Sequence, residues 1–231
     1  MSDNSSNNKK IDDSLLKTLE EKSKKLGIVS IGYAKLPEDV FNGNSSLEYL
    51  NAIVLTIPIE IYDNVIDNEK AQKLYDEYID FGNITNELSD YLTNEGFGTQ
   101  VLHPAEDLAD LSKLGQVAGL GYIGKNRLLI TPELGPRSKI SAILTTIENL
   151  PFSEENSHKW IKNYCRLCDI CIEGCPENAL VVKEDDLSKS NTINEKCMVG
   201  CNKGCTSCIE LCPFFKDGYD AVKESGNYII S

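Results

Sequence analysis

The chain has 231 residues, of which 41% are hydrophobic, so it is long enough to bury a substantial core. Its formal net charge of -13 argues against nucleic-acid binding, which depends on clustered Lys and Arg side chains. No apolar run approaches the ~20 residues that cross a bilayer, and the first ten residues lack a signal peptide. We therefore expect a cytoplasmic protein without a membrane role.

The first half of the chain alternates between helical and extended patterns. Apolar spacing predicts a helix, two strands and a long helix, in the order 12–26, 28–33, 52–57 and 69–92. Gly27 and Gly96 are the expected stops of the two helices. The second strand is apolar at almost every position, which is typical of a strand covered on both faces.

The pattern continues with a strand at 97–102, a helix from Pro104 to Gly119 or Gly121, and a strand at 138–147. This alternation predicts an α/β sandwich, of the α/β or α+β class. Beyond Pro151 the sequence changes to short turns and cysteines. The expected parts are a disordered N-terminus at 1–11, an α/β cofactor- or partner-binding domain at 12–150, a ferredoxin-like domain with two 4Fe-4S clusters at 151–218, and a tail at 219–231.

The nine cysteines all lie between Cys165 and Cys212, which in a cytosolic protein indicates metal rather than disulfides. Residues 165–176 read C-x2-C-x2-C-x3-C-P, the bacterial ferredoxin spacing, in which the fourth cysteine binds the other cluster. A second set, C-x2-C-x3-C-P, ends at Pro213. Crossed ligation predicts one cluster held by Cys165, Cys168, Cys171 and Cys212, and another held by Cys175, Cys205, Cys208 and either Cys197 or Cys201.

Zinc is the structural alternative, because C-x2-C pairs also form tetrahedral thiolate sites. A zinc site has no use for three cysteines at consecutive short steps followed by C-P. Eight ligands leave one of the nine cysteines spare, either Cys197 or Cys201, and we interpret it as an ordinary cysteine rather than a catalytic thiol. Iron–sulfur clusters transfer single electrons, so two adjacent clusters predict an electron path that ends in the N-terminal domain.

Residues 118–125 read A-G-L-G-Y-I-G-K, which approximates the dinucleotide fingerprint G-x-G-x-x-G. That fingerprint follows a strand and opens a helix, whereas this segment follows a helical stretch and leads into an extended one. We therefore expect a helix stop and a tight turn here, and no nicotinamide site.

Together with the cysteines, this segment, the turn at 135–137 and the Thr-rich strand at 144–146 resemble the epoxyqueuosine reductase family over about residues 100–215. Reductive dehalogenases resemble the chain more distantly. The resemblance implies an α/β domain that binds base-off cobalamin and receives electrons from the clusters, and it favours Cys197 as the eighth ligand. It also implies a corrinoid pocket lined by Gly119, Gly121, Tyr122, Gly124, Lys125 and Arg137.

The chain departs from that family in its acids and its length. Epoxide-reducing members carry a catalytic Asp before the glycine turn, and the corresponding place here is near Ala105, with Glu106 and Asp107 as neighbours. No catalytic residue is assigned for this reason. The sequence ends at Ser231, without the helical repeats that help those enzymes hold tRNA, so tRNA is not the expected substrate.

Two functions remain open from the sequence. One is an enzyme in which two clusters pass electrons to cobalamin for reduction of an unknown small-molecule substrate. The other is an electron-transfer protein or reductase subunit without a corrinoid, whose acidic surface suits a basic protein redox partner. A flavin in the same cleft is a further alternative. Each version needs an external electron donor such as ferredoxin or flavodoxin, and His103 and His158 do not distinguish between them.

Overall fold

The computed structural model describes residues 9–41, 49–62, 67–183 and 186–225, without the side chains of 187–189. Its contacts divide the chain into two compact units that alternate along the sequence. Unit 1 comprises Met1–Ile57, Tyr78–Ala118 and Ile140–Glu154, and unit 2 comprises Pro58–Glu77, Gly119–Lys139 and Glu155–Ser231. Two segments from before Pro151 thus pack with the cysteine-rich part, and the expected domains 12–150 and 151–218 stay a prediction. Within the described ranges, no helix is long and apolar enough to cross a membrane.

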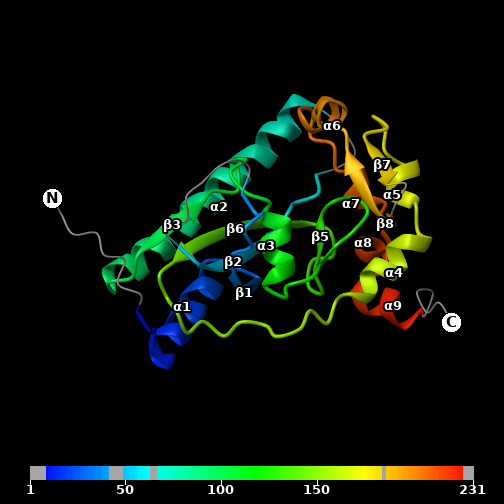
Figure 1. The fold of residues 1–231 in the computed structure, drawn as a ribbon. Coiled ribbons are helices and arrows are strands. Elements are labelled where there is room, and N and C mark those ends of the chain that lie inside the picture. Colours follow the sequence, from blue (N-terminus) through cyan, green and yellow to red (C-terminus); the bar gives the residue numbers. More distant parts are fainter. Residues whose placement is uncertain (1–8, 42–48, 63–66, 184–185, 226–231) are drawn as a thin grey trace. The chain divides into compact units, whose positions relative to one another are not determined.

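Unit 1 is built on a four-stranded sheet with the order β1-β2-β6-β3 (Figure 1). The strands are β1 Ser30–Lys35, β2 Asn51–Pro58, β3 Thr99–Leu102 and β6 Ser138–Thr145. β1 pairs antiparallel with β2, and β3 pairs antiparallel with β6. The predicted mixed α/β class is confirmed, and the buried residues of β2 fit the expected strand covered on both faces.

Helix α1 (Asp13–Lys25) begins at a side-chain cap, because the carboxylate of Asp12 accepts a hydrogen bond from the N–H of Leu15 at 2.8 Å. It ends before Gly27, whose φ of +89° is a left-handed conformation that glycine adopts without strain. Helix α2 (Asn68–Asn94) follows in the chain, and its later part belongs to unit 1. The core of unit 1 joins α1, α2 and one sheet face through Leu19, Tyr33, Ile53, Leu55, Phe81, Leu88 and Ile143.

The helix predicted from Pro104 is wrong over its first turns. Residues 104–108 form turns and a bend, in which the N–H of Glu106 donates to the carbonyl of His103 at 3.0 Å. Helix α3 (Leu111–Val117) begins only at Asp110, whose carboxylate caps it by accepting the N–H of Lys113 at 2.9 Å. The helix therefore begins at the capping carboxylate of Asp110 and not at Pro104, six positions earlier. The predicted stop holds, since Gly119 has a φ of +75°.

Unit 2 consists of short elements (Figure 1). Two hairpins are formed by β4 (Tyr122–Ile123) with β5 (Leu129–Ile130), and by β7 (Leu180–Lys183) with β8 (Asp186–Thr192). The helices are α4 Trp160–Leu167, α5 Ile170–Glu173, α6 Asn194–Cys201, α7 Ser207–Glu210, α8 Pro213–Lys216 and α9 Tyr219–Glu224. The predicted ferredoxin-like arrangement of this part stays a prediction.

Candidate metal centre

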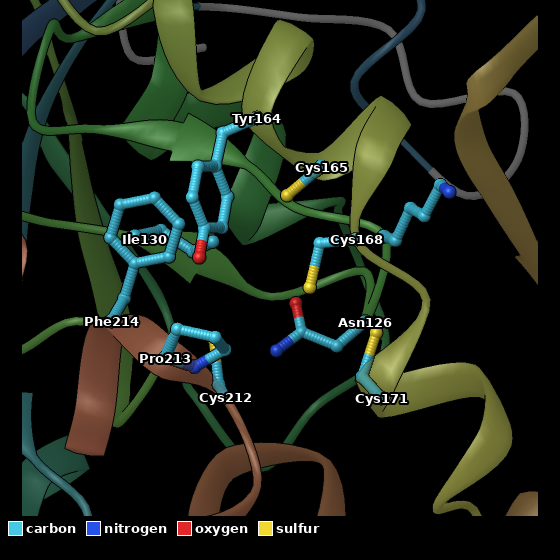
Figure 2. A pocket seen from close by; sticks show the side chains of 10 residues that line it. Asn126, Ile130, Tyr164, Cys165, Cys168, Cys171, Cys212, Pro213 and Phe214 are labelled. Atoms are coloured by element: carbon cyan, nitrogen blue, oxygen red, sulfur yellow. The ribbon is translucent and has the colours of Figure 1, made fainter. Parts of the chain in front are cut away.

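Four cysteines of unit 2 line one pocket, shown in Figure 2. They are Cys165, Cys168, Cys171 and Cys212, the set that crossed ligation assigns to a single cluster. Three come from the first cysteine segment and the fourth from the second, so the fold joins segments far apart in the chain. The remaining lining residues are Lys125, Asn126, Ile130, Tyr164, Pro213 and Phe214.

Short helices place these four sulfurs. Cys165 lies in the last turns of α4, and Cys168 is the residue that caps the end of that helix. Cys171 lies within the single turn of α5. Cys212 precedes α8, which opens with Pro213, a residue suited to a first helical turn because it needs no hydrogen-bond partner for its nitrogen. The C-P dipeptide of the motif is therefore a helix start.

Three of the four thiols are buried: Cys165 and Cys171 are each 8% exposed and Cys212 is 7% exposed. Burial raises the pKa of Cys165 and of Cys212 to about 12, and that of Cys171 to about 11. Such thiols give up their protons when a metal supplies compensating positive charge. A buried, all-sulfur donor set in crossed order fits an iron–sulfur cluster.

Main-chain N–H groups also point at these sulfurs. The N–H of Lys125 donates to Cys165, and the N–H of Phe214 donates to Cys212. Each bond favours the thiolate and lowers the pKa of its cysteine, although burial has the larger effect. The pocket therefore carries hydrogen-bond donors for negative charge on sulfur.

The other cysteines gather around α6 and α7. Burial is the main cause that raises the pKa of Cys208 to about 12. The neighbouring thiols that raise it further are, in decreasing order, Cys205, Cys171, Cys197 and Cys175. A Cβ at Gly200 would lie 3.1 Å from the Cβ of Cys205, so the glycine lets α6 approach the second cysteine segment closely.

The two candidates for the eighth ligand lie side by side on α6. The sulfurs of Cys197 and Cys201 are 3.6 Å apart. Their hydrogen bond lowers the pKa of Cys197 to about 6 and raises that of Cys201. The choice between them stays open. Within the part of the chain that the structure describes, no three Cys, His, Asp or Glu side chains converge as on a single metal ion.

Lys125 lies in the cysteine pocket and is only 2% exposed. Its ammonium forms an ion pair with Asp169 and donates to the carbonyl of Arg166 at 3.3 Å. Its own carbonyl accepts a hydrogen bond from Ser190. The resemblance placed Lys125 beside a corrinoid, and the structure places its charge against the first cysteine segment.

Sequence reasoning missed two polar residues of this centre. The side-chain Nδ2 of Asn126 donates to the carbonyl of Cys208 at 3.2 Å, and its position directly after Lys125 was the available indication. Lys70, in the first turns of α2, donates to Thr206 at 3.0 Å across 136 positions of sequence. No local pattern could have found that second contact.

The glycines of the predicted pocket serve backbone packing in unit 2. A Cβ at Gly121 would lie 2.1 Å from the carbonyl oxygen of Ile130, and one at Gly124 would lie 2.6 Å from the Cδ1 of the same residue. Both glycines thus allow β4 and β5 to approach each other, with Tyr122 paired opposite Ile130. Gly119 supplies the left-handed turn that precedes the hairpin.

The turn at Arg137 also contacts the cysteine-rich part of unit 2. A Cβ at Gly135 would lie 2.6 Å from the carbonyl oxygen of Phe214. The guanidinium carbon of Arg137 lies 6.0 Å from the ring centre of Phe215, and its carbonyl accepts the N–H of Ile59 at 2.7 Å. The predicted corrinoid-facing residues are thus part of the framework around the cysteines.

Comparison with known proteins identifies two groups of relatives. No family model matches the chain. A tetrachloroethene reductive dehalogenase of Desulfitobacterium hafniense is 31% identical over 118 residues, which is 43% of this chain and 21% of that protein. An epoxyqueuosine reductase of Gloeobacter violaceus is 42% identical over 66 residues, which is 29% of this chain and 19% of that protein. The chain thus spans about a fifth of the length of these curated relatives.

Solved structures share the fold. A reductive dehalogenase whose structure is described as suggesting a mechanism for B12-dependent dehalogenation superposes with a TM-score of 0.69 at 18% identity, covering 90% of this chain and 33% of that one. The resemblance inferred from the glycine and cysteine motifs is confirmed. The chain is a homologue of epoxyqueuosine reductases and of reductive dehalogenases.

Proposed function

We propose that this chain holds two 4Fe-4S clusters and delivers single electrons to a corrinoid, for the reduction of a substrate that its sequence does not name. The observation that carries the proposal is the grouping of Cys165, Cys168, Cys171 and Cys212 around one pocket in crossed order. When bound, the clusters supply one-electron redox centres and the corrinoid supplies a reducible cobalt.

The chain's own residues would hold and insulate the first cluster. The four thiolates bind the irons, and the N–H groups of Lys125 and Phe214 stabilise negative charge on sulfur. The side chains of Ile130 and Phe214 and the ring of Tyr164 line the same pocket and limit the access of water to it. Thiolate supply, hydrogen bonding and limited solvent access are the factors that set a cluster's potential.

The second cluster is assigned to Cys175, Cys205, Cys208 and Cys197, with Cys201 as the spare thiol. The thiols that raise the pKa of Cys208 include Cys205, Cys197 and Cys175, together with Cys171 of the first cluster, so the two proposed clusters are close neighbours. An external donor such as ferredoxin or flavodoxin, and a small-molecule substrate or protein redox partner, complete the proposal for a cytoplasmic reductase.

The proposal that the chain binds a corrinoid is supported by its relatives. A reductive dehalogenase of the same fold has a structure described as suggesting a mechanism for B12-dependent dehalogenation, and epoxyqueuosine reductases match the chain in sequence. Within the glycine segment and the following turn, Tyr122 and Arg137 are the proposed corrinoid-facing side chains, since both are half-buried rather than enclosed. Gly119, Gly121 and Gly124 would shape the backbone beneath them.

A second candidate is an electron-transfer protein without a corrinoid. The contacts of Gly121, Gly124 and Lys125 favour it, because hairpin packing and the cysteine pocket already account for these residues. The net charge of -13 suits transient contact with a basic redox partner.

Anaerobic reconstitution with iron and sulfide, with and without cobalamin, distinguishes the two functions. The corrinoid reductase predicts bound cobalt with a base-off Co(II) EPR signal, together with iron and acid-labile sulfide. The electron-transfer protein predicts the same iron and sulfide without retained cobalt. An Arg137→Ala variant that loses cobalt but keeps its iron would support the proposed corrinoid contact, and unchanged cobalt would contradict it.

A further inference from the structure

Two buried lysines reach the two cysteine motifs from outside them. Lys125 follows the β4 strand and is 2% exposed, and Lys70 lies in the first turns of α2 and is 5% exposed. Both belong to unit 2. Buried ammonium groups are uncommon in proteins because they lose hydration, so each is expected to have a local partner or a function.

The cysteine spacing defines equivalent positions in the two motifs. Residues 168–176 and 205–213 both read C-x2-C-x3-C-P, and their alignment sets Asp169 opposite Thr206. Asp169 is the N-terminal cap position of α5, and Thr206 is that of α7. The two residues therefore occupy the same place in sequence and in local structure.

Each buried lysine contacts one of these equivalent residues. The ammonium of Lys125 pairs with the carboxylate of Asp169. The ammonium of Lys70 donates to the hydroxyl of Thr206 at 3.0 Å and lies 3.8 Å from the carboxylate of Glu210. The lysines come from unrelated segments, so duplication of the cysteine motif does not explain the repeated contact.

The chain makes room for both lysines. A Cβ at Gly204 would lie 2.7 Å from the Cγ of Lys70, and Gly204 has a φ of +74°, so a glycine directly before Cys205 lets the lysine approach. Lys125 lines the pocket of Cys165, Cys168, Cys171 and Cys212 and also donates its N–H to Cys165.

We propose that these two ammonium groups set the reduction potentials of the two clusters. Lys125 acts on the cluster at Cys165, and Lys70 acts on the cluster at Cys205 and Cys208. The inference rests on the proposed function, since it needs the clusters. Reduction by a one-electron donor such as dithionite adds one negative charge to a cluster, with no other bond made or broken. A nearby buried positive charge stabilises that added charge and raises the potential, because the interior screens it poorly.

The partner carboxylates act in the opposite sense. Asp169 offsets the charge of Lys125, and Glu210 offsets that of Lys70. Removal of a lysine should therefore lower one potential, and removal of its carboxylate should raise the same potential. A purely structural ion pair predicts no such opposite pair of shifts.

The test is an anaerobic EPR redox titration of the reconstituted full chain, after iron and acid-labile sulfide have been counted. Lys125→Met and Lys70→Met should each lower the equilibrium constant of one of the two reduction steps by about tenfold, which lowers its potential by about 59 mV for one electron. Asp169→Asn should raise the reduction potential that Lys125→Met lowers, and Glu210→Gln should raise the one that Lys70→Met lowers. Lys203→Met is the matched control, because Lys203 is exposed and lies two residues before Cys205, so water screens its charge.

The outcomes separate the inference from the proposed function. If the reconstituted wild-type protein contains no iron and no acid-labile sulfide, the proposed function itself is wrong. Fully loaded lysine variants whose potentials match Lys203→Met would overturn the inference and leave the function intact. If a lysine variant does not take up its cluster, the carboxylate variants decide, because an unshifted potential in Asp169→Asn and Glu210→Gln overturns the inference equally.

Discussion

The side-chain amide of Asn126 donates a hydrogen bond to the main-chain carbonyl of Cys208 at 3.2 Å. The preceding residue, Lys125, contacts the first cysteine motif through Asp169 and Cys165. Two consecutive residues after Gly124 therefore contact one cysteine motif each, Lys125 the first and Asn126 the second. This relationship gives the glycine segment a physical role that does not depend on a corrinoid: it fixes the two cysteine segments to one hairpin.

Replacement of Asn126 by Ala should destabilise the loaded protein. The variant leaves the carbonyl of Cys208 and the N–H of Leu128 without their side-chain partner, and unpaired polar groups of this kind cost about 1–3 kcal/mol. Anaerobic guanidinium unfolding measures the change. Asn202→Ala, at an exposed position, is the control and should stay within about 0.5 kcal/mol of wild type. Equal stability of the two variants would refute the bridging role.

Gly121→Ala tests the close approach within the hairpin. The new Cβ would lie 2.1 Å from the carbonyl oxygen of Ile130, so the backbone must move, at a cost of about 3 kcal/mol. Gly218→Ala is the matched control in the same unit, since no atom lies within 4 Å of the new Cβ, leaving only the backbone strain of a residue at φ +88° and ψ 158°, about 1–3 kcal/mol. A smaller loss for Gly121→Ala than for the control would contradict the packing described.

The eighth ligand can be identified by single substitutions on α6. Cys197→Ser should reduce iron content by about four atoms per chain, whereas Cys201→Ser should keep the full complement, because the proposed assignment leaves Cys201 spare. Iron analysis with EPR of the reduced protein measures both. Loss of iron in Cys201→Ser alone would reverse the assignment.

His158 should make the stability of unit 2 depend on pH. Its Nδ1 lies 2.6 Å from the hydroxyl of Tyr219, which accepts a hydrogen bond from Trp160 at 3.1 Å. Burial lowers the pKa of His158 below its ordinary value of 6.5. The unfolded chain therefore binds a proton first as the pH falls through about 6.5, and the stabilisation that is complete above that pH is lost below it.

Urea unfolding of wild type and His158→Gln between pH 7.5 and 5.5 measures this dependence. Loss of clusters in acid affects both proteins equally. The difference between their changes in unfolding free energy therefore measures the contribution of His158. The wild type should lose more stability than the variant on acidification. Parallel curves would show that His158 is not held neutral by its surroundings.

Local signals account for much of the fold. Helix α1 followed from apolar spacing and from Gly27, and β2 followed from a continuous apolar run that is rich in β-branched residues. The start of α3 was misplaced because Pro104 and Asp110 are both acceptable helix starts, and the helix begins at the second, where the Asp110 carboxylate caps it. Strand order depends on contacts between distant segments, which periodicity does not encode.

The site shows the same division. The ferredoxin spacing predicted the four cysteines that line one pocket, because in that motif the cysteine before the proline binds the cluster of the other segment. Lys70 could not be anticipated, since 136 positions separate it from Thr206. The roles of Gly121 and Gly124 were also hidden, because a glycine pattern does not reveal which surface approaches it.

Chemical analysis of anaerobically purified protein tests the central claim most directly. Iron, acid-labile sulfide and zinc are counted per chain, and the dithionite-reduced sample is examined by EPR. The account predicts about eight irons, about eight sulfides and the signal of reduced 4Fe-4S clusters. Zinc bound by the cysteines, with no acid-labile sulfide, would contradict it.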